Sequence, residues 1–185
     1  MKHLGTKTLK TNRLTLRQFK IEDSKDMFTN WASSESVTKF FSWQPHNNQE
    51  TTKFVINSWV NNYKDNSYYQ WAIQLNDIGQ VIGSISVVSF NNETASAHIG
   101  YCIGEKWWKK GIMTESLQAV IDFLFTQDGV NEITSTHDVE NPNSGKVMQK
   151  CKMKYLCTKI GGGTNNRGVV DIKIYNILRQ DYLND

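Results

Sequence analysis

The residues whose types and order point most directly to chemistry lie between Lys109 and Thr114. Lys109 and Lys110 precede Gly111, and an amphipathic segment begins directly after that glycine. The first N–H groups of a helix are unpaired and partly positive, and a glycine there lets a phosphate approach the backbone closely. The pattern therefore predicts a diphosphate cradle made of backbone amides, with the lysines adding charge. A solvated basic turn that only starts a helix is the alternative, because one glycine is a weak signal.

This cradle needs a strand before it and a helix after it, and the spacing of apolar residues indicates both. In residues 96–103, alternation places Ala97, Ile99, Tyr101 and Ile103 on one face of a strand, and His98, Gly100 and Cys102 on the other. After Gly111, apolar residues recur at the spacing of one helix face, at Leu117, Val120, Ile121, Leu124 and Phe125. The cradle is thus expected at a strand-to-helix turn.

The rest of the chain predicts one α/β (α+β) domain over residues 1–185, with a central mixed, mostly antiparallel sheet and helices on both of its faces. Strands are expected at 13–19, 70–75, 81–90, 96–103, 132–139, 155–160 and 169–178, which makes about seven. Helices are expected within 21–41, 47–65, 112–125 and 141–153, and the glycine-rich segment 161–168 is expected to be a flexible hairpin loop.

Composition and charge exclude several classes of protein. The 185 residues carry 21 basic and 18 acidic side chains, and a net charge of +3 is too small to indicate nucleic acid. No apolar run approaches the roughly 20 residues that cross a bilayer, and the N-terminus lacks a secretory leader. Cys102, Cys151 and Cys157 show no metal-ligand spacing, so we expect reduced thiols, a cytoplasmic protein and no metal.

Two motifs in the right order carry a resemblance to a known family. The segment "HIGYCIGEKWWKKGIMTESLQAVIDFLF" resembles the acetyl-CoA motif of GNAT-superfamily N-acetyltransferases, and it is most similar to the ribosomal-protein N-terminal acetyltransferase (RimJ/RimL) branch. The segment "ENPNSGKVMQKCKM" resembles the branch's following helix through Asn141, Ser144, Val147 and Lys150, and "NRLTLRQF" resembles its first strand. The order of elements matches over nearly the whole chain.

The resemblance implies a binding site for acetyl-CoA. It implies a sheet that splays between its fourth and fifth strands, with the pantetheine arm paired to free backbone groups there and the diphosphate on the turn after the fourth strand. Asn141 and Ser144 would flank the thiol end of the arm. The coenzyme contacts that it implies are Cys102, Ile103, Gly104, Trp108, Lys109, Lys110, Gly111, Ile112, Met113, Thr114, Asn141 and Ser144.

This sequence departs from the family pattern at the turn. The usual Gln or Arg is Trp108, and the final Gly or Ala is Met113, whose side chain is expected to crowd the diphosphate. Backbone donors survive such changes. The glycine that usually follows the second motif is Lys152.

The resemblance also implies the catalytic residues. His98 stands where related enzymes often carry a glutamate, and a histidine with a pKa near 6.5 accepts a proton directly or through water. Ser144 is the candidate acid or thiol-orienting hydroxyl, and it also suits a helix cap. A half-buried, merely structural histidine is the alternative for His98. The tyrosine acid of many relatives is replaced by Met148.

The implied reaction is direct acetyl transfer from acetyl-CoA to a primary amine, either a protein N-terminal α-amine such as that of a ribosomal protein, or a small-molecule amine such as a polyamine or antibiotic. Partners other than acetyl-CoA and this acceptor, namely nucleic acid and membrane, are not expected, and the protein is expected to be a monomer or homodimer. A degenerate acyl-CoA-binding protein without turnover and a nucleic-acid module that uses "KWWKK" remain as alternatives, although no second basic cluster supports the last.

Overall fold

The computed structural model describes residues 2–184 and arranges them around one eight-stranded sheet. The strands lie in the order β1-β2-β3-β4-β5-β6-β8-β7. Only β5 and β6 pair in parallel among the neighbouring strands of the described chain. The strand bounds are β1 Leu9–Lys10, β2 Leu14–Arg17, β3 Gln70–Leu75, β4 Val81–Asn91, β5 Ser96–Ile103, β6 Glu132–Asp138, β7 Lys154–Asn165 and β8 Gly168–Leu178. The expected mixed, mostly antiparallel sheet is confirmed.

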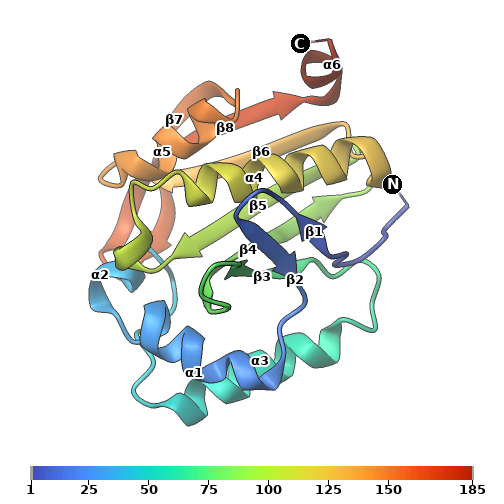
Figure 1. Cartoon of the computed structure of the whole chain (residues 1–185). Helices are drawn as coiled ribbons and strands as arrows, with labels where there is room; N and C mark the ends of the chain where they lie inside the picture. The colour runs from blue at the N-terminus through green and yellow to red at the C-terminus, as the bar shows by residue number, and fades with distance from the viewer. Residues whose placement is uncertain (1, 185) are drawn as a thin grey trace.

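Helices cover both faces of this sheet, as expected (Figure 1). The helix α4 lies across one face, and α1 and α3 lie on the opposite side. The longer helices are α3 Gln49–Asn62, α4 Ile112–Phe123 and α5 Pro142–Lys150. The short ones are η1 Ile21–Asp23, α1 Ser24–Met27, η2 Phe28–Ala32, α2 Glu35–Thr38, η3 Glu105–Trp107, η4 Leu124–Asp128 and α6 Arg179–Leu183.

Two hydrophobic clusters, one on each face, hold the helices to the sheet. The first joins α4 and α5 to the strands through side chains such as Leu117, Met148 and Ile99. The second packs Met27 and Trp31 against the far face. Burying each large apolar side chain contributes on the order of 1.5–3 kcal/mol, so these clusters fix where the ends of β5, β6 and α4 meet.

The alternation predicted for β5 is confirmed and divides the strand between the two clusters. Ala97, Ile99, Tyr101 and Ile103 belong to the cluster under α4 and α5. Cys102 points the other way and is buried in the second cluster. The predicted helix face is also confirmed, since all five of its apolar side chains are buried.

Three details differ from the sequence-based expectation. The strand count is eight rather than about seven, because the two-residue β1 is too short to show a periodic pattern. The glycine-rich segment is not a long loop: β7 continues to Asn165, and only Asn166 and Arg167 form the turn. Pairing with β8, at Gly163 with Val170, supplies the backbone partners that overrule the low strand propensity of glycine.

The segments 21–41 and 49–62 show the limits of periodicity. The first divides into four short helical pieces. The second is one helix as expected, but its apolar residue Phe54 does not face the core and is 78% exposed. The buried side of α3 is instead formed by Thr52 and Ile56.

Candidate active site

The parallel strands β5 and β6 separate after a short paired stretch. The paired residues are Ser96 with Glu132, Ala97 with Ile133, and His98 with Thr134. One side-chain bond, from the Ser135 hydroxyl to the Ile99 carbonyl at 2.8 Å, follows. From Gly100 to Ile103, β5 pairs only with β4, and we call this segment the unpaired stretch of β5. The expected splay between the fourth and fifth predicted strands is therefore present.

The register with β4 decides which backbone groups of this stretch face the departed β6. The Gly104 N–H donates to the Ile82 carbonyl at 3.0 Å. Because successive residues of a strand direct their backbone groups to opposite neighbours, Cys102 also faces β4, whereas Tyr101 and Ile103 face away from it. Of Cys102, Ile103 and Gly104, the three strand-end residues expected to contact the coenzyme, only Ile103 directs its backbone groups toward β6.

Trp108 closes the end of the unpaired stretch. Its side chain is 41% exposed, and its indole N–H donates to the Ile103 carbonyl at 2.8 Å. The neighbouring Trp107 is buried in the core. Trp108 therefore occupies the Ile103 carbonyl, one of the backbone acceptors expected to bind the pantetheine arm. The Ile103 N–H and the backbone groups of Tyr101 remain available to bind the arm.

Two residues in the turn between β5 and α4 have a left-handed backbone conformation. Lys109 has φ 60° and Gly111 has φ 76°. Gly111 is the N-cap of α4 and offers no side chain to the first turn. The first helical bond that the turn receives runs from Glu115 N–H to the Gly111 carbonyl, and no described residue accepts the N–H groups of Lys109 to Thr114. The turn therefore presents unpaired donors to solvent, as a phosphate site requires.

Met113 does not crowd this turn. Its side chain is 6% exposed and packs in the core, beside the equally buried Ile112. The expectation that Met113 narrows the diphosphate site is therefore not supported: a helical residue directs its side chain inward while its N–H stays at the helix end.

Ser144 and Asn141 meet the unpaired stretch from the start of α5. Asn141 is the N-cap of α5, and no described residue bonds its side-chain amide. The Ser144 hydroxyl donates to the Tyr101 phenol at 3.1 Å, and the phenol donates to the Ser144 carbonyl at 2.9 Å. Burial raises the pKa of Tyr101, so the phenol stays protonated at neutral pH. Tyr101 was assigned only to packing by its alternation, and no sequence signal tied it to Ser144.

His98 lies on the other face of β5, at the last residue paired with β6. Its Nδ1 is 2.9 Å from the Thr134 hydroxyl, which in turn donates to the Ala97 carbonyl at 3.5 Å. With the ring proton on Nδ1, this contact leaves Nε2 free to accept a proton. Burial lowers the pKa of His98, so the ring is neutral at pH 7.

His98 and Ser144 thus flank the unpaired stretch from opposite faces of the sheet. His137, in contrast, is buried beneath α5: its Nδ1 bonds the Asp138 carbonyl at 2.8 Å, and its Nε2 lies against Gly145 without a partner in the described chain. It fills the core rather than the open end of the strands.

On the His98 face, the β7–β8 turn is tied to the segment that follows α2. Asn166 donates through its side chain to the Thr38 and Trp43 carbonyls, and through its backbone to the Phe41 carbonyl. Arg167 bonds Asp138, at the end of β6, at 2.9 Å. These bonds fix the segment 39–48 near the end of β6.

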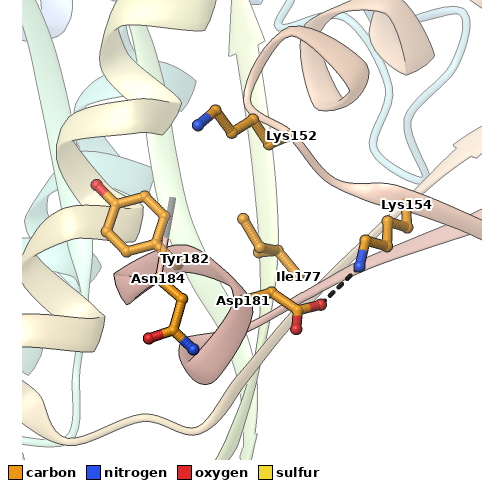
Figure 2. A pocket seen from close by; sticks show the side chains of 6 residues that line it. All are labelled: Lys152, Lys154, Ile177, Asp181, Tyr182 and Asn184. Atoms are coloured by element: carbon orange, nitrogen blue, oxygen red, sulfur yellow. Dashed lines mark hydrogen bonds and ion pairs between the residues drawn. The ribbon is translucent and has the colours of Figure 1, made fainter.

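A separate pocket of about 310 Å³ lies beside α6 (Figure 2). It is lined by Lys152, Lys154, Ile177, Asp181, Tyr182 and Asn184. Ile177 pairs with Ile133, at the end of β6 where β5 and β6 are still joined, so this pocket is not part of the open end. Within residues 2–184 no cluster of metal-ligating side chains is found, and no helix there has the length and apolar character to span a bilayer.

Known proteins are similar to this chain in sequence and in fold. Residues 13–154 match the family described as acetyltransferase (GNAT) domain. The chain is 26% identical over 175 residues to the N-acetyltransferase p20 of Bacillus licheniformis, covering 95% of this chain and 98% of that protein. It is 24% identical over 154 residues to the [ribosomal protein uS5]-alanine N-acetyltransferase of Escherichia coli (strain K12), covering 77% and 75%. The structure of MccE, the microcin C7 self-immunity acetyltransferase in complex with acetyl-CoA and AMP, superposes with a TM-score of 0.80 at 18% identity, covering 91% of this chain and 93% of MccE.

The matched segment contains the parted strands, the left-handed turn and α5, the elements that the geometry singles out. Acetyl-CoA is the acetyl donor of this family. The chain belongs to the GNAT acetyltransferase family and is an acetyl-CoA-dependent N-acetyltransferase.

Proposed function

We propose that this enzyme acetylates the α-amine of a protein N-terminus, with acetyl-CoA held along the unpaired stretch of β5. The observation that carries the proposal is that unpaired backbone donors at the turn Lys109–Thr114 continue into the unpaired stretch and end at Ser144. Acetyl-CoA is an extended molecule with a diphosphate, a pantetheine arm and a thioester. It needs an anion site for the diphosphate, a strand-like backbone site for the arm and polar groups at the thioester end.

Each part of the chain has a role in this arrangement. The N–H groups from Lys109 to Thr114 bind phosphate oxygens, and the side chains of Lys109 and Lys110, both exposed, add positive charge. The backbone groups of Tyr101 and Ile103 bind the amides of the arm, and Asn141 completes that contact. Acetyl-CoA, when bound, supplies the acetyl group as a thioester.

His98 serves as the base that receives the proton of the acceptor amine. Its lowered pKa keeps the ring neutral at pH 7. Deprotonating an α-amine with a pKa near 8 costs about 1.4 kcal/mol at pH 7, whereas a lysine amine near 10.4 costs about 4.6 kcal/mol. A weak base therefore suffices for an N-terminus. On the opposite face, the Ser144 hydroxyl, which bonds the Tyr101 phenol, rotates to donate a hydrogen bond to the departing thiolate and stabilises its charge. The hydroxyl keeps its proton, and the released thiolate takes its proton from solvent.

The buried carboxylate near the open end is not available to a polyamine. Asp138 is the carboxylate at the end of β6, and it accepts bonds from Arg167, Asn165 and the Glu140 N–H. A carboxylate bound in this way does not attract a polycationic acceptor. The relationship to the enzyme from E. coli that acetylates an alanine of ribosomal protein uS5 supports the same class of acceptor.

The test is acetyl transfer from acetyl-CoA to a panel of acceptors. The panel contains peptides that begin with Ala, Ser or Met and lack lysine, the same peptides with a blocked N-terminus and one internal lysine, and spermidine. Thiol release gives the rate, and mass spectrometry locates the product. We expect transfer to free N-termini at rates at least about tenfold above the other acceptors, given the difference in amine pKa. Transfer to spermidine alone, or binding of acetyl-CoA without transfer to any acceptor, contradicts the proposal.

A further inference from the structure

An arginine from the start of the chain reaches the turn before α4. Arg13 lies directly before β2, yet its Nη1 donates to the Lys110 carbonyl at 3.0 Å. Its Nε and Nη2 both lie 2.7 Å from Oε2 of Glu115, in the first turn of α4. These bonds fix the guanidinium against the backbone segment that the predicted diphosphate cradle occupies.

Glu115 is fully engaged by this neighbourhood. Its Oε1 accepts the Thr11 hydroxyl at 2.6 Å and the Arg13 N–H at 3.0 Å. Burial by itself would raise the pKa of Glu115, but the bonds from Thr11 and Arg13 outweigh it and leave the pKa lowered. An unpaired carboxylate here would repel a phosphate at the helix N-terminus. Arg13 removes that repulsion.

Two N–H groups of the Arg13 guanidinium remain available as hydrogen-bond donors. Arginine has five N–H bonds, and the contacts to Glu115 and the Lys110 carbonyl use three of them. The remaining two, on Nη1 and Nη2, have no acceptor in the described chain. The side chain is 41% exposed, and Nη2 stands 3.6 Å from where a Cβ on Gly111 would be. The spare donors are therefore beside the left-handed glycine and open to solvent.

We propose that Arg13 is a phosphate-binding residue of the coenzyme site, oriented by Glu115. This inference rests on the proposed placement of the coenzyme diphosphate at Lys109–Thr114. An arginine fork held by a carboxylate is preorganised for a phosphate oxygen, and its charge-assisted bonds are stronger than those of neutral backbone donors. Arg13 thus recognises the phosphorylated part of the donor rather than its thioester end.

The experiment compares two acetyl donors in the full-length enzyme. Acetyl-CoA carries the phosphates and S-acetylpantetheine does not, and the readout is the ratio of their kcat/KM values. We expect Arg13→Ala to lower kcat/KM for acetyl-CoA by about tenfold or more, and to leave that for S-acetylpantetheine within about twofold, because one charge-assisted contact is lost. Arg13→Lys is expected to fall between, since it keeps the charge but not the fork.

Two further variants keep the test decisive. Arg17→Ala is the matched control, because Arg17 is also ion-paired, to Asp23 at 2.8 Å, but lies in β2 and has no contact with the turn. Its donor ratio should equal that of the wild type. Arg13→Ala with Glu115→Gln avoids a half-buried carboxylate that has lost its ion-pair partner, so it remains informative if the single variant does not fold. The double variant should show the same loss of preference.

Failure of this inference is distinct from failure of the proposed site. A wild-type enzyme that uses both donors equally well overturns the placement of the diphosphate, and with it the role of Arg13. A wild type that prefers acetyl-CoA while Arg13→Ala retains the full preference overturns only the assignment of Arg13.

Discussion

The Tyr101 phenol on β5 and the Ser144 hydroxyl on α5 form a reciprocal pair of hydrogen bonds across 43 residues of sequence. Ser144 donates through its hydroxyl to the phenol at 3.1 Å, and the phenol donates back to the Ser144 carbonyl at 2.9 Å. Burial raises the pKa of the Tyr101 phenol, so the phenol stays protonated and keeps both bonds at neutral pH. In the proposed mechanism Tyr101 is a positioning residue, because its two bonds hold Ser144 beside the unpaired stretch, where the departing thiol would lie.

Replacing Tyr101 by Phe should lower kcat more than it raises KM. The Ser144 hydroxyl loses its acceptor and the part-buried Ser144 carbonyl loses the phenol as a donor, at a cost of about 1 kcal/mol to stability. We expect kcat to fall by about tenfold with the KM for acetyl-CoA within about twofold, measured by steady-state kinetics with a thermal-unfolding midpoint for each variant. Tyr155→Phe is the control, since the Tyr155 phenol bonds only Thr158 on the exposed edge strand. A variant with lower stability but unchanged kcat would assign Tyr101 to the fold alone.

Replacing His98 by Gln should remove a pH dependence. The pKa of His98 is lowered by burial, so the wild-type rate should fall as pH decreases through a value below 6.5, where Nε2 becomes protonated. We expect His98→Gln to lose about 10²-fold in kcat at pH 7.5 and to lack that acidic limb. The profile of kcat against pH, measured with a saturating N-terminal peptide, gives both the loss in rate and its pH dependence. The same decrease in rate at acidic pH in the variant would refute His98 as the base.

His98 should also make the stability of the folded protein depend on pH. Because its folded pKa lies below its unfolded value, the folded protein binds fewer protons, so this contribution is present above about pH 6.5 and is lost as pH falls. The wild-type unfolding midpoint should decrease with falling pH more steeply than that of His98→Gln.

Replacing Gly111 by Ala should weaken acetyl-CoA binding beyond its effect on folding. An alanine at φ 76° costs about 1–2 kcal/mol, whatever the free space around it. Gly79→Ala is the matched control, since Gly79 has φ 67° with no neighbour within 4 Å of an added Cβ and lies in the turn between β3 and β4. Both variants should lose similar stability, but only Gly111→Ala should raise the KM for acetyl-CoA, by about fivefold or more if about 1 kcal/mol of the strain is felt on binding. Equal KM values for the two variants would show that the turn does not hold the coenzyme.

Replacing Cys102 by Ala should leave turnover intact. Burial raises the pKa of the Cys102 thiol to about 11, so almost no thiolate exists at pH 7. Its backbone faces β4 and its side chain packs in the core, so the change should cost about 1 kcal/mol of stability and alter kcat by less than about threefold. Trapping of an acetylated Cys102 by mass spectrometry, or loss of turnover in a folded variant, would contradict direct transfer.

The parts of this site that depend on near neighbours in the chain could be predicted from the sequence. Gly111 begins α4 where the amphipathic pattern starts, and β5 alternates between two buried faces as its residues do. Both follow from backbone geometry that repeats every two or 3.6 residues. The departure of β6 from β5 was also expected, though only by resemblance to a family.

The parts of the site that depend on strand register or on contacts between distant segments could not be predicted from the sequence. Whether Cys102 or Ile103 offers its backbone to the open side depends on the pairing of β5 with β4, which a shift of one residue would invert. The exposure of Phe54 and the passage of β7 through its glycines were decided by what α3 and β8 pack against.

The sequence by itself thus determined the family, the alternation of strands and helices, and the position of the turn before α4, because these depend on local periodicity and on single residues such as Gly111. Only the tertiary structure brought Tyr101 to Ser144 and Arg13 to Glu115, 102 residues away. Side-chain contacts across such separations arise when the sheet and α4 bury a common core, and no local pattern encodes which polar groups then meet at its edge.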